Sequence, residues 1–205
     1  MNDRQLIDRM TGAADDVALA QLRVRLAEQA AEEGLLDVAY RTMDSPIGPL
    51  LLAATPAGLV RVAFDRENHD AVLVELSAAI SPRVLRSSRR VDNVARQLDE
   101  YFAGRRRSFD VPVDLQLSKG FRRAVLAHLL EIPYGRRESY TVVARAAGNA
   151  KAVRAAGSAC ATNPIPLVVP CHRVVRTDGT YGQYRGGPEA KHMLLTMEAA
   201  SDSNL

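Results

Sequence analysis

One stretch of the chain reads Asn163-Pro164-Ile165-Pro166-Leu167-Val168-Val169-Pro170-Cys171-His172-Arg173-Val174-Val175. Its apolar run at 167–169 predicts a short strand, and Pro170 ends that strand because proline has no N–H to donate to a ladder. Cys171 and His172 follow, where the chain must turn. A thiol reacts as its thiolate, which nearby cations stabilise, so His172 and Arg173 would make Cys171 a nucleophile. The stretch alone leaves open a second reading, in which Cys171 is a small buried hydrophobe.

The segments on both sides of this stretch favour the nucleophile. Pro-Cys-His-Arg-Val at 170–174 is preceded by Asn163-Pro164-x-Pro166 and followed by Tyr181-Gly182-Gln183-Tyr184-Arg185-Gly186-Gly187. Together they resemble the active-site signature of the alkylguanine-DNA alkyltransferases, or methylated-DNA–protein-cysteine methyltransferases, and similar patterns extend over most of residues 40 to 198. The resemblance implies direct-reversal DNA repair, in which an alkyl group such as methyl moves from O6 of guanine to Cys171. Whether O4 of thymine is a second target stays open.

Composition sets limits on the protein class. The chain has 205 residues, 47% of them apolar, which suffices for one large domain or two small ones. Residues 119–198 carry 12 Lys and Arg against 5 acids, whereas residues 1–38 carry 4 Arg against 8 acids. The cationic C-terminal part fits a polyanionic partner.

The two cysteines, Cys160 and Cys171, predict a reducing, cytoplasmic setting without a disulfide, since the start of the chain shows no secretory segment. No apolar run reaches the roughly 18 residues of a membrane helix, so we expect no membrane contact. Some members of the resembled family bind zinc in their N-terminal half, where this chain has no cysteine. We therefore expect no metal and no cofactor.

Periodicity divides the chain into three parts. Residues 1–38 predict an acidic helical extension that packs against the body or another chain, with breaks at Gly12 and Gly34; its apolar residues at helical spacing are Leu6, Met10, Val17, Leu22, Leu26, Ala30 and Leu36. Residues 39–111 predict an α/β domain with a β-meander over 40–64 and helices at 70–80 and 91–102. The resemblance implies that this domain is ribonuclease H-like, with a small antiparallel sheet and helices. A linker is predicted at 110–113.

Residues 112–205 predict a mostly α-helical domain. A helix at 121–130 is followed by Ser139, which can cap a helix at 140–147, and Gly148-Asn149 separates that helix from another at 150–161. The pair is typical of a helix-turn-helix or of an ordinary αα-hairpin. A last helix begins at Pro188.

The second helix of the pair is smooth, because alanine, glycine and serine occupy most of it. Only Lys151 and Arg154 are long and polar, so the helix can approach a groove closely but reads sequence poorly. The resemblance implies double-stranded DNA with alkylated bases as partner, bound through the minor groove, with Arg154 entering the base stack and Tyr140 crowding the flipped nucleotide. The expected DNA-binding residues are Arg154, Tyr140, Lys151, Ala152, Ala155 and Gly157. We expect a monomer, and clustering along DNA stays open.

The resemblance also assigns the chemistry. Cys171 would be the nucleophile, with His172 acting through a water, Glu198 orienting His172, Tyr140 protonating the departing guanine and Asn163 bracing the turn. Neighbouring residues of an extended backbone point to opposite faces, so His172 can act on Cys171 only through a water or a turned backbone. Asn163 also fits a helix C-cap, and Glu198 a solvent-facing acid on a helix that buries Met193, Leu194 and Met197. The expected base pocket comprises Val174, Tyr184, Arg185, Gly186 and Pro166.

Three other functions stay open. A methylation-sensing DNA-binding regulator would need base-reading side chains and a second methyl-accepting cysteine. A lesion-binding relative without transfer activity would lack the cysteine, and a thiol hydrolase would need a different order of its catalytic residues. Alkyl transfer to Cys171 would leave a thioether that nothing in the sequence could hydrolyse, so each molecule would react once.

Overall fold

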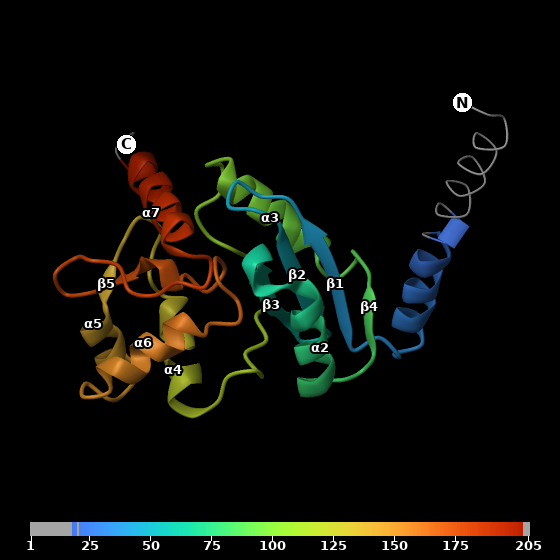
Figure 1. The fold of residues 1–205 in the computed structure, drawn as a ribbon, viewed down its shortest axis with the longest axis horizontal. Helices are drawn as coiled ribbons and strands as arrows, with labels where there is room; N and C mark the ends of the chain where they lie inside the picture. The colour runs from blue at the N-terminus through green and yellow to red at the C-terminus, as the bar shows by residue number, and fades with distance from the viewer. Residues whose placement is uncertain (1–17, 20, 203–205) are drawn as a thin grey trace.

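A computed structural model describes residues 18–19 and 21–202 of the chain. A β-sheet with two helices forms the N-terminal domain, and a group of helices joined by long loops forms the C-terminal domain (Figure 1). Within the described residues no helix is long and apolar enough to cross a membrane. The fold confirms the predicted α/β domain followed by a mostly α-helical domain.

The sheet has the strand order β3-β2-β1-β4. β1 (Val38–Met43), β2 (Leu50–Thr55) and β3 (Gly58–Phe64) form the predicted antiparallel meander. β4 (Val84–Arg86) pairs with β1 in parallel, so the sheet is mixed and not purely antiparallel. Its three residues are too few to show a strand period in the sequence.

The two faces of the sheet are covered by different elements. α2 (His69–Ala79) packs Val72 and Leu76 against one face. α3 (Asp92–Phe102) packs against the other, and that core continues into the C-terminal domain. Both helices lie where the sequence predicts them, and a short 3-10 helix, η1 (Asp65–Glu67), leads from β3 to α2.

The predicted linker is bound to the sheet. The N–H of Leu59 donates to the carbonyl of Pro112 at 2.8 Å, and the N–H of Asp114 donates to the carbonyl of Leu59 at 2.8 Å. Gly58 has φ +141°, and a Cβ at this position would overlap the Pro112 carbonyl. The chain therefore leaves the N-terminal domain along a fixed path.

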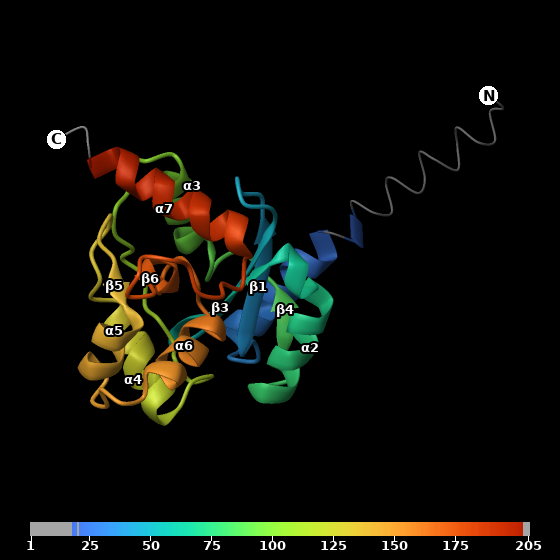
Figure 2. The same cartoon turned by 60° about the vertical axis from the view of Figure 1, so that its left-hand side comes forward.

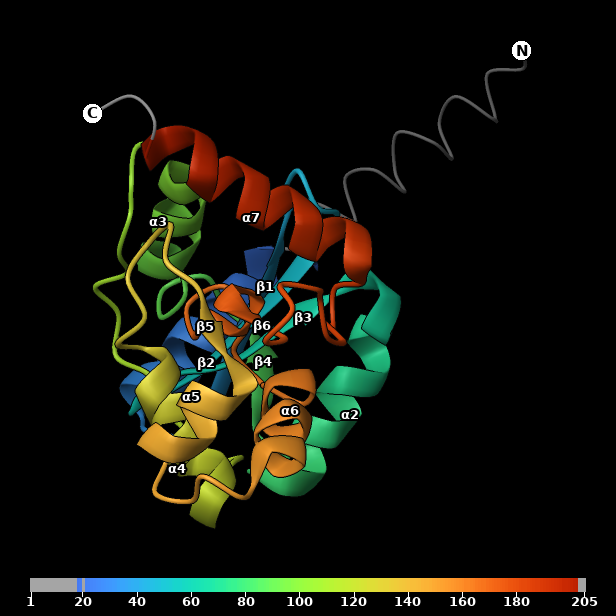
Figure 3. The same ribbon diagram turned by 90° about the vertical axis from the view of Figure 1, so that its left-hand side faces the viewer.

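The C-terminal domain contains α4 (Gly120–Leu129), α5 (Tyr140–Ala146), α6 (Val153–Ala161) and α7 (Pro188–Asp202). Two short parallel strands, β5 (Glu138–Ser139) and β6 (Val174–Val175), join its loops. α5 and α6 form the predicted helical pair, with Ser139 Oγ accepting the N–H of Val142 and Gly148 at φ +92°. α7 crosses above the loops of this domain (Figures 2 and 3), and its Glu198 accepts a hydrogen bond from Tyr101 on α3.

The second helix of the pair is shorter than predicted. α6 begins at Val153, and residues 150–152 form a turn. Asn149 stabilises this turn, because its side chain accepts the N–H of Lys151 at 3.1 Å and its carbonyl accepts the N–H of Ala152 at 3.0 Å. Lys151 and Ala152 therefore precede the helix and do not lie on it.

The extension contains a helix over residues 21–32, which ends before Gly34 at φ +70°. It contacts the body through Ala27, whereas Leu22 and Leu26 are 54% and 57% exposed. The predicted apolar stripe of this helix is therefore mainly solvent-facing. Leu6, Met10, Gly12 and Val17 lie outside the described residues.

Candidate active site

The loop that carries Cys171 is built around Asn163, which is 1% exposed. Asn163 Nδ2 donates to the carbonyl of Val169 at 2.8 Å, and its Oδ1 accepts the N–H of Ile165 at 2.9 Å. The side chain thus closes the turn that leads to the cysteine. The neighbouring C-cap position of α6 is Thr162, so Asn163 braces the loop instead of capping the helix.

The prediction of a strand at 167–169 is wrong. The N–H of Val169 donates to the carbonyl of Ile165 at 2.9 Å, and Leu167 has φ +74°, so the run forms a compact turn. Two prolines, Pro164 and Pro166, remove N–H donors that a strand ladder would need. The apolar side chains are buried because the loop itself lies in the core.

The backbone at Cys171 is turned and not extended. Cys171–Arg173 form a 3-10 helix, η2, with the N–H of Arg173 donating to the carbonyl of Pro170 at 3.0 Å. Cys171 is 2% exposed and His172 is fully buried. Of the two arrangements left open by the sequence, the structure has the turned backbone.

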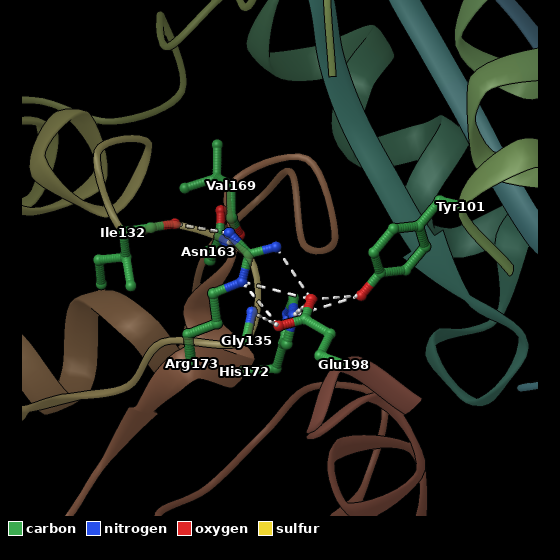
Figure 4. Close-up of polar contacts among 8 residues, drawn as sticks. All are labelled: Tyr101, Ile132, Gly135, Asn163, Val169, His172, Arg173 and Glu198. Carbon is green, nitrogen blue, oxygen red and sulfur yellow. Dashed lines mark hydrogen bonds and ion pairs between the residues drawn. The ribbon is translucent and has the colours of Figure 1, made fainter. Parts of the chain in front are cut away.

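Glu198 on α7 is the centre of a buried hydrogen-bond network (Figure 4). Its Oε1 lies 3.0 Å from His172 Nε2 and accepts hydrogen bonds from Arg173 Nη2 at 2.9 Å and the Tyr101 hydroxyl at 2.7 Å. Its Oε2 accepts from Arg173 Nε at 3.0 Å and from the N–H of Gly135 at 3.1 Å. Glu198 is 1% exposed, so the solvent-facing reading of this residue is wrong.

This network fixes the tautomer of His172. Burial acts to raise the pKa of Glu198, but the hydrogen bonds from His172 and Arg173 outweigh it and hold that pKa well below its usual range. An ionised carboxylate only accepts, so Nε2 of His172 carries the proton. Nδ1 is buried and has no hydrogen-bond partner among the described residues, which leaves its lone pair free. Burial also lowers the pKa of His172.

The pKa of the Cys171 thiol is raised, whereas the sequence predicted that nearby cations would stabilise its thiolate. Burial raises the pKa of its thiol to about 11, against the opposing effects of Asn163 and Lys191. Arg173 does not act as the predicted activating cation, because its guanidinium is bound to Glu198. Cys171 therefore rests as a thiol and needs a base to react.

Two site residues are absent from the sequence prediction. Lys191 is fully buried and donates from Nζ to the carbonyl of Val174 at 2.6 Å. Its helical spacing could have indicated its burial, since positions 191, 194, 195 and 198 form the buried stripe of α7. Met193, which the sequence predicted to be buried, is 44% exposed. Tyr101, on α3, had no such signal, because only the fold brings it to Glu198.

Tyr140 is the first residue of α5 and is half-buried. Burial raises the pKa of its hydroxyl to about 12, so Tyr140 remains a hydrogen-bond donor at neutral pH. A Cβ at Gly182 would overlap this hydroxyl, and a Cβ at Gly157 would lie 3.9 Å from the ring. Gly182 therefore makes room for the tyrosine, whereas a Cβ at Gly157 would only be in ordinary contact with its ring.

The expected DNA-binding residues other than Tyr140 lie on α6 or in the turn before it. Arg154 and Ala155 are exposed on α6, and Lys151 is exposed in the preceding turn. Ala152 is half-buried in that turn, and Gly157 is half-buried against Tyr140.

The expected pocket residues are only partly brought together. Tyr184 and Arg185 line a hollow of about 540 Å³, together with Gly182 and Gly187. Arg185 Nε also pairs with Glu67 at 3.1 Å. Val174 and Pro166 are buried, and Gly186 packs against the ring of Phe64; none of these three lines the hollow. The described residues contain no group of three or more His, Cys, Asp or Glu that could hold a metal ion.

Fold and site define a protein in which a buried cysteine is followed by a histidine bound to a glutamate, in a domain that also contains the helical pair α5 and α6. Residues 38–115 match the ribonuclease-like domain of 6-O-methylguanine DNA methyltransferase, and residues 120–200 match its DNA binding domain. The chain therefore belongs to the 6-O-methylguanine DNA methyltransferase family, and DNA is its partner.

Individual relatives of the chain support the same family assignment. The chain is 38% identical to the methylated-DNA–protein-cysteine methyltransferase of Methanosarcina acetivorans over 78% of this chain and 98% of that protein. It is 39% identical to that of Mycobacterium bovis, covering 78% of this chain and 91% of the relative. The crystal structure of Mycobacterium tuberculosis O6-methylguanine methyltransferase superimposes with a TM-score of 0.69 at 36% identity, covering 80% and 94% of the two chains. The same protein in complex with DNA gives a TM-score of 0.68.

Proposed function

We propose that this protein repairs DNA by transferring an alkyl group, methyl in the simplest case, from O6 of guanine to Cys171. The observation that carries the proposal is the arrangement of a buried Cys171 on a turned segment with His172 and Glu198 behind it. Family membership supports the same reaction and does not favour a methylation-sensing regulator.

The reaction is a displacement at a saturated carbon. The proton of the Cys171 thiol passes through a bridging water to Nδ1 of His172, which has no protein partner among the described residues, and the resulting thiolate attacks the alkyl carbon. The S–C bond forms as the C–O6 bond breaks, and its electron pair goes to the guanine. Glu198 stabilises the imidazolium that forms, as the third group of a triad does.

The departing guanine needs a proton, because it would otherwise leave as an anion. We assign this role to the Tyr140 hydroxyl, which remains protonated at neutral pH and lies at the loop that lines the hollow with Tyr184 and Arg185. The glycines of that loop allow the main chain to approach a flat base.

The damaged base must leave the duplex to reach a cysteine that is 2% exposed. Extrusion costs a few kcal/mol of stacking and pairing. We propose that α6 lies in the minor groove, where exposed Arg154 replaces the flipped base by stacking, while Tyr140 crowds its phosphate. Lys151, Ala152, Ala155 and Gly157 then provide a close, sequence-independent contact.

The product is a thioether on the protein, so the reaction is irreversible and stoichiometric. We propose that the protein acts as a monomer in the reducing cytoplasm, where both cysteines stay free thiols. The transfer requires no metal or cofactor, because the thiolate is the nucleophile and the departing base takes a proton.

The test is to incubate the protein with a duplex that carries one O6-methylguanine and to map the added methyl group by peptide mass spectrometry. Methyl is expected on the peptide containing Cys171 and absent from the Cys171→Ser variant. Methyl on Cys160, or on the Cys171→Ser variant, would overturn the assignment. A Cys160→Ser variant is the matched control and should still react.

A further inference from the structure

The N-terminal domain contributes one side chain to the hydrogen-bond network of Glu198, that of Tyr101 on α3. Its hydroxyl donates to Glu198 Oε1 at 2.7 Å and lies 3.5 Å from His172 Nε2. Tyr101 is fully buried. Its ring packs at centroid distances of 5.5, 5.3 and 6.0 Å against Phe102, Phe109 and Tyr134, so residues before and after the linker fix it in place.

Tyr101 is one of three hydrogen-bond donors that share the negative charge on Glu198 Oε1. Oε1 accepts from Tyr101, Arg173 and His172 at once, at 2.7, 2.9 and 3.0 Å. Burial raises the pKa of the Tyr101 hydroxyl far above its usual value, so this group stays a donor. A carboxylate oxygen that is shared among three donors attracts each proton less strongly than one that serves His172 alone.

We propose that Tyr101 is a positioning residue for alkyl transfer, supplied by the N-terminal domain, which shares Glu198 Oε1 so that Glu198 orients His172 without charging it. The inference rests on the proposed function, in which neutral His172 takes the proton of Cys171. A His172 that is already protonated has no lone pair at Nδ1 and cannot accept that proton.

The groups around His172 and Glu198 indicate that Arg173 and Tyr101 have different effects on the carboxylate. Arg173 neutralises Glu198, since it makes hydrogen bonds to both carboxylate oxygens. Tyr101 adds no charge, so its effect is to orient Oε1 and weaken its pull on the His172 proton. The titratable groups that the described residues place around His172 and Glu198 include Tyr101 from α3, Arg173 and Cys171 from η2, Tyr184 from the loop before α7, and Lys191 from α7. Tyr134 packs behind Tyr101 and Arg173.

The experiment compares Tyr101→Phe with the unmutated chain. Loss of the hydroxyl concentrates the Glu198 charge on His172, so the pKa of His172, followed by NMR of its imidazole, should rise. Transfer to a duplex carrying O6-methylguanine should slow about tenfold at neutral pH, the scale of one lost hydrogen bond to a charged group. The acid limb of the pH–rate profile should move to higher pH, and the rate should recover in alkaline buffer.

Two controls separate this effect from a general loss of packing. Tyr40→Phe removes the same atom from a residue packed on the other face of the sheet, and Phe109→Leu disturbs the ring cluster around Tyr101 without touching its hydroxyl. Neither should move the His172 titration. A rate loss in Tyr101→Phe that is equal at every pH, or an unchanged or lowered pKa of His172, would overturn the proposal.

The unmutated chain gives an independent test if Tyr101→Phe does not fold. The chain has four histidines, so the nitrogen signals of His172 can be assigned. They should show a neutral ring protonated at Nε2 at pH 7, and a charged ring would overturn the proposal. Failure of the proposed function would appear separately, as absence of methyl on Cys171 of the unmutated protein.

Discussion

Replacing Glu198 by Gln should weaken both the fold and the reaction. The change keeps the size of the side chain but removes a charge that is 1% exposed and paired with Arg173, whose side chain is 7% exposed. Removing one partner of a buried ion pair typically costs about 3–5 kcal/mol, because the other charge remains buried without compensation. The new amide NH2 also faces N–H donors of Arg173 or Gly135 in place of an acceptor.

The assay is urea unfolding followed by circular dichroism, from which the free energy of unfolding is extrapolated. Glu131→Gln is the matched control, because Glu131 is 76% exposed in its contact with His128 and should change stability by less than about 1 kcal/mol. In the folded Glu198→Gln protein, the Cys171 pKa should rise and methyl transfer at neutral pH should slow, with recovery at alkaline pH. A stability equal to that of Glu131→Gln, together with an unchanged pH–rate profile, would refute the reasoning.

Three further outcomes follow from the same geometry. Arg154→Ala should reduce transfer from duplex DNA far more than transfer from free O6-methylguanine base, because Arg154 offsets extrusion; equal losses in the two rate assays would place it in chemistry or folding. DNA affinity measured by fluorescence anisotropy should fall linearly on a log–log plot against salt, and Lys151→Gln should reduce the slope by about one; an unchanged slope would remove Lys151 from the phosphate contacts. Because the folded pKa of Glu198 is depressed, its contribution to stability should be complete well above its unfolded pKa of about 4.3 and should disappear as pH falls below that value; pH-dependent unfolding of Glu198→Gln should lack this decline.

Local patterns predicted most of the helices and the meander, because each of these elements carries its own period and its own caps. The turn chemistry of Ser139 and Gly148 placed α5 correctly. The start of α6 was wrong since the side chain of Asn149 competes with the first helical turn, and the strand at 167–169 was wrong since neighbouring prolines and Asn163 favour a turn.

Long-range contacts explain what the sequence could not predict. Tyr101 and Glu198 are 97 positions apart, and no local period connects them. The pairing of β4 with β1 likewise depends on how the elements pack. The resemblance named Cys171, His172 and Glu198 as a group, but the pKa of Cys171 required the structure, because burial outweighs the cations around it.

The central claim is that the chain itself is the alkyl acceptor, once per molecule, at Cys171. The most direct measurement is the amount of methyl transferred per chain when duplex carrying O6-methylguanine is in large excess, followed by intact-protein mass spectrometry. We predict a single rapid phase that stops at one methyl group per active chain, with that group on Cys171. Continued repair beyond one equivalent, or repair without a gain in protein mass, would contradict the account.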